Sequence, residues 1–255
     1  MTSLWSVGTF RPGHAAQKAR PLLSHARATL DRVSDFLLLV PILLFSIVAH
    51  EYAHGYAALR MGDTTAQRLG RLTWNPVKHL DPFLSLLLPL VTFFGGGFIL
   101  GAAKPVPVDP RNFRELRKGD IIVSLAGVTA NLAIAIACVP LLALFGMLAR
   151  SMPDAASVFG SLQFMLRAGI FLNLILIVFN LLPIPPLDGS HVMKYLLPPR
   201  IAAMYVRVGM YGMAILMVLL VFGGPVLDVV FWPARMGYAF LMSLVGPYAL
   251  PGAGL

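Results

Sequence analysis

Residues 36–59 read FLLLVPILLFSIVAHEYAHGYAAL, an apolar run whose only charged residue is Glu51. As a helix rising about 1.5 Å per residue, this run is long enough to cross the roughly 30 Å hydrocarbon core of a bilayer. The preceding residues 1–35 are mixed and contain five Lys and Arg residues. A secretory signal places its apolar core much closer to the start of the chain. We therefore predict that residues 36–59 form a first membrane-spanning helix.

The rest of the chain has the same character. The 255 residues are 58% hydrophobic and 12% charged, which lies well outside the range of soluble domains. Five further apolar runs follow the first: Pro82–Leu100, Ile121–Leu148, Phe164–Leu187, Ile201–Phe222 and Val226–Val245. We predict an all-α polytopic membrane protein with five or six transmembrane helices.

The net charge of +9 raises the question of a nucleic-acid partner. The Lys and Arg residues fall at the ends of apolar runs, where the positive-inside rule places them. No basic run is interleaved with aromatic residues, so we expect the lipid bilayer and no nucleic acid as a partner. The single cysteine, Cys138, excludes an internal disulfide and a cysteine-based zinc site, and we expect it to be a small buried apolar residue.

The second run, Pro82–Leu100, is broken by Pro89 and by the glycines at 95–97. It either spans the membrane or re-enters on the same side, because irregular backbone at membrane depth needs cover from protein or a water-filled cavity. The count of spans and the side of the N-terminus depend on this choice. We divide the chain into a polar basic segment (1–35), a membrane core (36–195) and a C-terminal helical pair (196–255).

The first run contains His50-Glu51-Tyr52-Ala53-His54. On a helix the two histidines lie one turn apart on one face, so both imidazoles can reach one metal ion. Glu51 is close enough to handle a metal-bound water without being a ligand. Ionisable groups at this depth in a bilayer are costly and usually functional. The pattern favours a metal site over a chance string on an apolar helix.

A catalytic zinc site needs a third protein ligand and an open position for water. Acidic residues near membrane depth are scarce, and the candidates are Asp188 and Asp228. Asp188 follows three prolines in the stretch 180–189, NLLPIPPLDG, where an unwound segment could present a carboxylate at depth. The alternative is that Asp188 caps the next helix, and the residues alone leave the two roles about even.

Together these two motifs resemble the site-2 protease family of intramembrane zinc metalloproteases. Four further segments resemble its compact bacterial branch, which lacks PDZ and CBS domains: GRLTWNP (70–76), HLDP (79–82), AKPVPV (103–108) and LAG (125–127) followed by Asn131. The resemblance covers about residues 36–195.

The resemblance implies that His50, His54 and Asp188 bind one zinc ion and that Glu51 is the general base. Asn180 matches the asparagine that polarises or positions the scissile carbonyl. The implied activity is hydrolysis of peptide bonds in or near transmembrane segments of membrane-protein substrates, in regulated intramembrane proteolysis. The implied location is the bacterial cytoplasmic membrane. In this family the two ligand-bearing helices run parallel with one span between them, which favours a re-entrant 82–100. That arrangement places the basic N-terminus outside. The positive-inside rule favours the opposite orientation, so we leave the side of the N-terminus open.

Two other functions compete with this one. A zinc-binding membrane transporter would explain deep histidines, but it has little need of a glutamate directly after a ligand. The membrane zinc proteases of prenylated C-termini take a third ligand from a later glutamate, and here the only other glutamate is Glu115 in a basic loop. We therefore reject this last class and keep the transporter as the alternative.

Smaller expectations complete the prediction. A sheet edge near residues 68–73 could bind an unwound substrate strand by main-chain pairing. His79 and His191 are expected at span ends and not as ligands, while His14 and His25 have no metal spacing. Asn131 and Asn173 are expected to form hydrogen bonds between helices. The substrate and the oligomeric state have no signature in the sequence.

Overall fold

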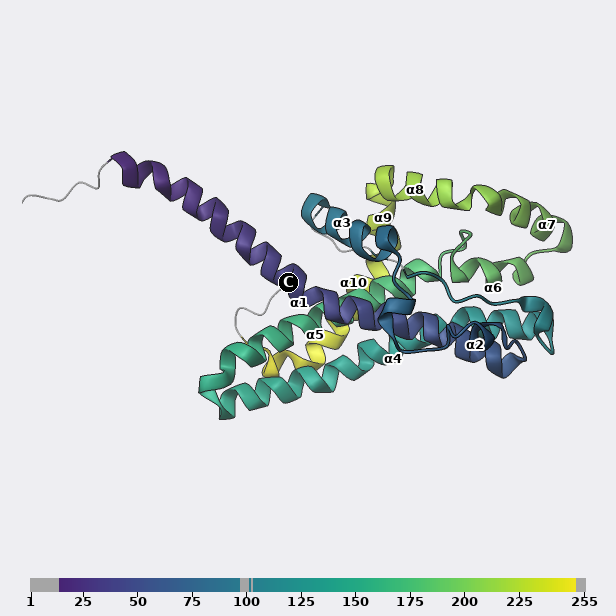
Figure 1. The fold of residues 1–255 in the computed structure, drawn as a ribbon, viewed down its shortest axis with the longest axis horizontal. Helices are drawn as coiled ribbons and strands as arrows, with labels where there is room; N and C mark the ends of the chain where they lie inside the picture. The colour runs from purple at the N-terminus through teal and green to yellow at the C-terminus, as the bar shows by residue number, and fades with distance from the viewer. Residues whose placement is uncertain (1–13, 97–100, 102, 251–255) are drawn as a thin grey trace, which may run out of the picture. The chain divides into compact units, whose positions relative to one another are not determined.

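The structure is a computed structural model that describes residues 14–96, 101 and 103–250. The chain divides into two units, residues 1–38 and 39–255. The first unit contains the N-terminal part of helix α1 (His14–Met61). All contacts described below lie in the second unit. Figure 1 shows the helices with the labels used here. Among the described residues every regular element is helical, which confirms the all-α class.

Four helical segments are long and apolar enough to cross a membrane: Arg32–Met61, Leu116–Ser151, Pro153–Asn180 and Pro199–Leu220. The pair Gly224–Val230 and Trp232–Tyr248, bent by 46°, makes a fifth if it counts as one span. We predicted five or six spans, and the structure has four candidate spans, or five if the bent pair is one span. Residues 82–96 form a π-helical turn, η2 (Pro82–Leu87), and the short helix α3 (Leu88–Gly96), and they are not among these spans.

One hydrogen bond bears on whether the 82–96 segment crosses the membrane. The backbone N–H of Arg114 donates to the carbonyl of Met61, the last residue of α1, at 2.9 Å. Helix α4 (Leu116–Ser151) begins two residues later. The chain therefore leaves α1 and enters α4 at the same end, and everything between them begins and ends on one side. Of the two alternatives for this segment, the re-entrant one is favoured.

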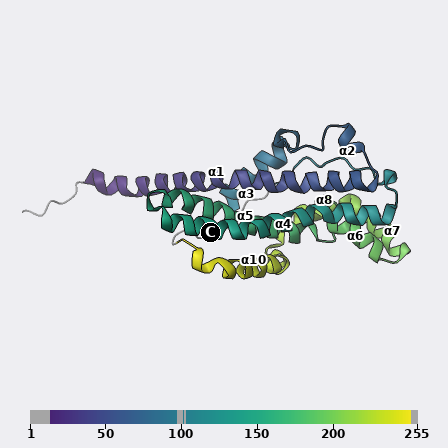
Figure 2. The ribbon, with the colours of Figure 1, turned by 90° about the horizontal axis from the view of Figure 1, so that it is seen from below.

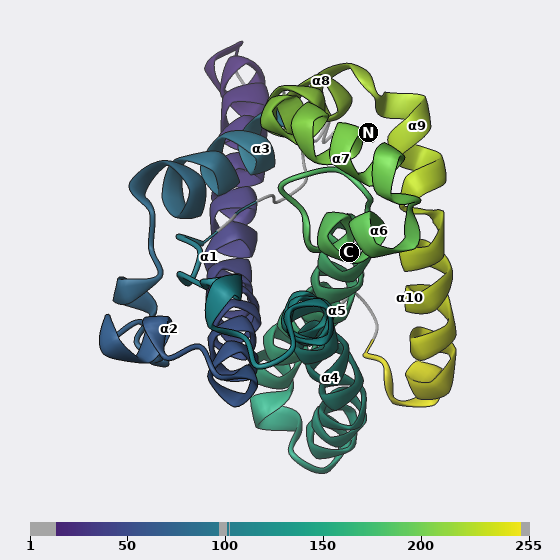
Figure 3. The same ribbon diagram turned by 90° about the vertical axis from the view of Figure 1, so that its right-hand side faces the viewer.

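The connection between α1 and α4 contains short helices and turns: α2 (Thr65–Arg68), η1 (Pro76–Lys78), η2, α3 and η3 (Pro110–Asn112). Figure 3 shows α2 on one side of α1 and α4 with α5 on the other. Trp74 holds the loop after α2 on α1 by stacking on Tyr52, with ring centroids 4.6 Å apart.

The predicted sheet edge at 68–73 is wrong. Arg68 ends α2, and Gly70 turns the chain at a φ of 61°, in the left-handed region that favours glycine. The segment is too tightly turned to offer an extended edge, and no strand occurs anywhere in the described part of the chain.

Helices α4 and α5 (Ala156–Asn180) are linked by η4 (Pro153–Ala155) and lie side by side (Figure 2). Their shared core consists of Cys138, Leu142, Leu166 and Ile170, joined by Val245 from α10 (Trp232–Val245). Cys138 is buried here, as expected of a small apolar residue. On the other face of α5, Leu172 and Leu176 pack with Leu43 and Ile47 of α1.

The chain after α5 turns through residues 181–187 into helix α6 (Asp188–Leu196). Helices α7 (Pro199–Val208), α8 (Gly212–Phe222) and α9 (Gly224–Val230), the single turn η5 (Gly209–Tyr211), and α10 with the turn η6 (Gly246–Tyr248) follow. The division of the chain at residues 35 and 195 stays a prediction.

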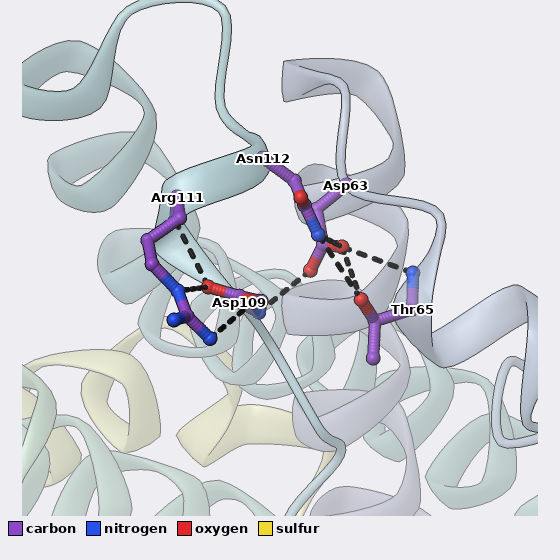
Figure 4. Close-up of polar contacts among 5 residues, drawn as sticks. All are labelled: Asp63, Thr65, Asp109, Arg111 and Asn112. Atoms are coloured by element: carbon purple, nitrogen blue, oxygen red, sulfur yellow. Dashed lines mark hydrogen bonds and ion pairs between the residues drawn. The ribbon is translucent and has the colours of Figure 1, made fainter.

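A buried carboxylate fastens the end of α1 to the loop before α4 (Figure 4). Asp63, with 1% of its surface exposed, accepts hydrogen bonds from Thr65, from the backbone N–H of Asp109 at 2.8 Å and from Asn112 Nδ2 at 2.9 Å. Burial raises the pKa of Asp63, but these hydrogen bonds outweigh it and hold the pKa below its ordinary value. Asp63 therefore stabilises the folded state only while it is ionised.

This predicts a pH-dependent cost for Asp63→Asn. At pH 7 the free energy of unfolding should fall by about 1–3 kcal/mol, because buried donors lose a charged acceptor. The depressed pKa means that the contribution of Asp63 is complete above the unfolded value of about 3.9 and is lost at lower pH. Unfolding in detergent should show the gap between wild type and variant closing below about pH 4. A gap unchanged from pH 7 to pH 3 would contradict this account. Asp109→Asn, whose side chain pairs only with Arg111 at the surface, should cost less than about 1 kcal/mol.

Candidate metal centre

His50 and His54 project from one face of α1, as their spacing predicts. Their rings meet edge to face with centroids 4.6 Å apart, and the two Nε2 atoms lie 3.0 Å apart. His50 is 9% exposed and His54 is half-buried. The helix thus presents two imidazole nitrogens to a single point.

Asp188 approaches the same point from another part of the chain. It is the first residue of α6, and its Oδ2 lies 3.4 Å from His50 Nε2 and 3.3 Å from His54 Nε2. The turn before α6 is tight, because a Cβ on Gly189 would lie 2.2 Å from the carbonyl oxygen of Leu181. Leu187 holds the N-cap position, so the structure does not show Asp188 capping a helix that starts near Ser190. Asp188 instead faces the two histidines.

The three atoms fit one tetrahedral zinc ion. Zinc binds imidazole nitrogen and carboxylate oxygen at about 2.0–2.2 Å, which sets adjacent ligand atoms of a tetrahedron about 3.3 Å apart. The observed separations are 3.0, 3.3 and 3.4 Å. These three residues form a group of possible metal ligands with all ligand atoms within 4.8 Å of one another. Asp188 Oδ2 is also buried and has no hydrogen-bond partner among the described residues.

The orientation of His54 is fixed by the backbone of α4. Its Nδ1 lies 2.7 Å from the carbonyl oxygen of Val123. A carbonyl can only accept, so Nδ1 must carry the hydrogen and Nε2 of the neutral ring keeps its lone pair. Histidines that bind a metal through one ring nitrogen usually donate the N–H of the other to a carbonyl, a carboxylate or water. His54 is therefore held in the tautomer that a metal needs.

Gly127 on α4 leaves room for the two histidines of α1. A Cβ at this position would lie 2.5 Å from both His50 Cε1 and His54 Nε2, closer than real Cβ atoms approach other atoms. The helix can pack this close to the pair only with hydrogen in place of a side chain.

Glu51 lies next to the cluster and is held by the segment before α4. Its Oε2 accepts the backbone N–H of Val106 at 2.7 Å. The segment around Val106 is fixed in turn, because Lys104 donates its N–H to the carbonyl of His79 and Arg71 donates to the carbonyl of Lys104. The carboxylate of Glu51 therefore has a defined direction without belonging to the ligand group.

The remaining candidate residues are not part of the group of possible metal ligands. Asn180 ends α5 and donates from Nδ2 to the carbonyl of Leu176 at 2.9 Å, eight positions before Asp188. Asp228, the other candidate ligand, forms an exposed ion pair with Arg235. His79 is buried in the loop, bonded to the carbonyl of Thr73, and does not belong to the ligand group, as expected.

The expected interhelical hydrogen bond of Asn173 is present. Asn173 on α5 donates to Ser46 Oγ on α1, one turn before His50. Asn131 is fully buried, but its side chain has no hydrogen-bond partner in the described part of the chain, so its predicted bond is not observed.

Comparison with known proteins identifies the family. Residues 38–223 match the model of "Peptidase family M50". The chain belongs to this family. The resemblance to site-2 proteases is thereby confirmed, and the chain is a member of the intramembrane zinc metalloproteases, with His50, His54 and Asp188 as its candidate metal site.

The similar proteins include bacterial relatives that are named zinc metalloproteases. "Putative zinc metalloprotease YwhC" of Bacillus subtilis is 40% identical over 195 residues, which cover 76% of this chain and 84% of the relative. "Putative zinc metalloprotease Rip2" of Mycolicibacterium smegmatis is 35% identical, over 75% of this chain and 70% of the relative. Rip2 of Mycobacterium tuberculosis H37Rv is 34% identical, over 77% and 73%. No solved structure gives a significant match to this M50 peptidase.

The contact at Gly127 generates a prediction. Gly127→Ala should displace the imidazoles and weaken zinc binding by at least about tenfold. Loss of a residue that orients a metal ligand typically lowers metal affinity by that much, and a displaced ligand should lower it similarly. Gly160→Ala on α5 is the matched control, since nothing lies within 4 Å of the added Cβ. Zinc titration against a competing chelator measures both. Equal affinity in the two variants would show that α4 does not confine the histidines.

Proposed function

We propose that His50, His54 and Asp188 hold one zinc ion and that Glu51 is the general base for cleaving peptide bonds of membrane proteins. The observation that carries this proposal is the convergence of three ligand atoms at tetrahedral spacing, with the His54 tautomer set by Val123. The proposal goes beyond family membership because it assigns the roles residue by residue.

The chemistry follows from the positions of the side chains. A bound zinc ion supplies a water of lowered pKa, about 7, and a Lewis acid for the scissile carbonyl. Glu51 takes the proton of the attacking water and returns it to the leaving amine. Because Val106 engages one carboxylate oxygen, Glu51 keeps its direction through both transfers. The surroundings of low dielectric strengthen each of these interactions.

We assign Asn180 to positioning the substrate carbonyl. Its amide group has two N–H donors and one of them is used within α5, which leaves the second for a substrate. Its place at the end of α5, before the turn that leads to Asp188, supports this role.

We propose a transmembrane or membrane-adjacent segment as the substrate and the bacterial cytoplasmic membrane as the location. His50 and His54 lie on a helix that is apolar enough to cross a bilayer, so a substrate that reaches them must itself lie in or near the membrane. The amides of a helical substrate are engaged in intrahelical bonds, so the segment must unwind locally before attack.

The alternative function, a zinc transporter, has less support. A transport path needs successive sites, and the described residues contain a single group of three or more possible metal ligands. Zinc flux into proteoliposomes that persists in Glu51→Gln would favour transport over proteolysis.

The Glu51→Gln variant tests the proposal. It should retain about one equivalent of zinc and lose at least about 10²-fold in cleavage rate, because an amide cannot accept the proton of the water. Membrane proteomes of cells with wild type and variant should then differ by an uncut membrane protein that accumulates. Glu115→Gln is a close control, since Glu115 is the only other glutamate and pairs with Lys118 at the surface. A purified wild-type protein that binds no zinc, or undiminished cleavage by Glu51→Gln, would overturn the proposal.

A further inference from the structure

Asp120 is a buried carboxylate near the start of α4, and three side chains of a single short helix satisfy it. It is 3% exposed. His191 Nδ1 and Tyr195 Oη each lie 3.0 Å from its oxygens, and Lys194 Nζ lies 2.5 Å from Oδ2. All three donors belong to α6, the helix that begins with Asp188.

The spacing of these donors makes the contact a rigid one. Positions 191, 194 and 195 lie on one face of a helix, so three bonds to one carboxylate fix both the rotation and the axial position of α6. Arg117, one turn before Asp120 on α4, adds a hydrogen bond to the carbonyl of Tyr195 at 3.3 Å. A buried carboxylate is costly unless it is fully paired, so α6 cannot shift away from Asp120 without a large penalty.

Asp188 is coupled to this contact through the helix itself. It precedes His191 by three residues, so the two lie on the same side of α6 within one turn. On its other side, Asp188 follows the tight turn 181–187, which connects it to the end of α5. The contact with Asp120 holds the same helix, and with it the same carboxylate, against α4.

Helix α4 thereby serves both parts of the site. Its Val123 carbonyl orients His54 of α1, and Asp120, one turn earlier, holds the helix that carries Asp188. The two attachments lie three residues apart on one continuous helix, so the distance between the ligands from α1 and from α6 is set by α4.

We propose that Asp120 is a positioning residue for the metal site: by holding α6 against α4, it places the Asp188 carboxylate on the two imidazoles. This inference rests on the proposed three-ligand zinc site. Asp120 itself is three residues from Val123 and binds neither metal nor substrate. Its role is to set the geometry of a ligand that belongs to another helix.

Zinc affinity, measured by competition with a chelator, tests this inference without relying on activity. Asp120→Asn keeps the shape of the side chain but replaces a charged acceptor with an amide that cannot accept from all three donors. We expect affinity to fall by about tenfold, at the lower end of what supporting residues of metal sites contribute. Glu115→Gln removes a carboxylate from the same end of helix α4 and should bind zinc as wild type does. Tyr195→Phe, which deletes one donor of the three, should give a smaller loss and serves if Asp120→Asn does not fold.

A double-mutant cycle separates positioning from a general structural role. In an Asp188→Ala background the zinc retains only the two histidines, so Asp120→Asn should have no further effect on affinity. An equal loss in both backgrounds would show that Asp120 acts on the histidines or on the whole fold, and would overturn the inference. Wild-type affinity in both Asp120→Asn and Tyr195→Phe would overturn it as well. Failure of the proposed zinc site is a different result, because wild type would then bind no zinc.

Discussion

Three lone-pair-bearing atoms, from His50, His54 and Asp188, meet at one point, and much of the surrounding structure serves to hold them there. Without a cation such an arrangement is costly, because His54 Nε2 and Asp188 Oδ2 are converging acceptors that only a proton on His50 Nε2 could bridge. The repulsion between these atoms can persist in the folded state only where neighbouring elements fix each group. The approach of α1 to α4, the tight turn before α6 and the loop around Val106 can all be understood as consequences of this constraint.

Helix α4 is the common support of the site, although it contributes no ligand to it. Its residue at position 127 is glycine and has no side chain, so the imidazoles can lie against the backbone of α4. It offers the Val123 carbonyl to His54 and the Asp120 carboxylate to α6. Because α4 is antiparallel to its neighbour α5 and shares a packed core with it, these three contacts have a rigid base. Asp63 performs a similar task for the loop that carries Val106, since it binds the backbone of Asp109.

Sequence reasoning selected the residues of the candidate metal site because their signals are local or rare. The spacing of His50 and His54 equals one helical turn, and Asp188 is one of two acidic residues near membrane depth in the later part of the chain. The long apolar helices were predictable for the same reason. The path of residues 82–96 was left open by the residues themselves and was favoured as re-entrant only by the family resemblance, because it depends on the bond between Arg114 and Met61, two residues far apart in sequence. The expected sheet edge failed because α2 and the turn at Gly70 prevail over a composition that suggested a strand.

The contacts that hold the candidate ligands in place could not be predicted from the sequence either. Val106 and Val123 act through backbone groups that every residue possesses, so no residue type marks them. Asp120 could be recognised only after α6 had been placed on α4.

The most direct test of the central claim is X-ray absorption at the zinc edge of the purified, detergent-solubilised protein. The account predicts one zinc per chain with two imidazole nitrogens and oxygen ligands at about 2.0–2.2 Å, and the imidazole signal reduced in His54→Ala. A spectrum without imidazole ligands, or one that shows sulfur in the first shell, would contradict it.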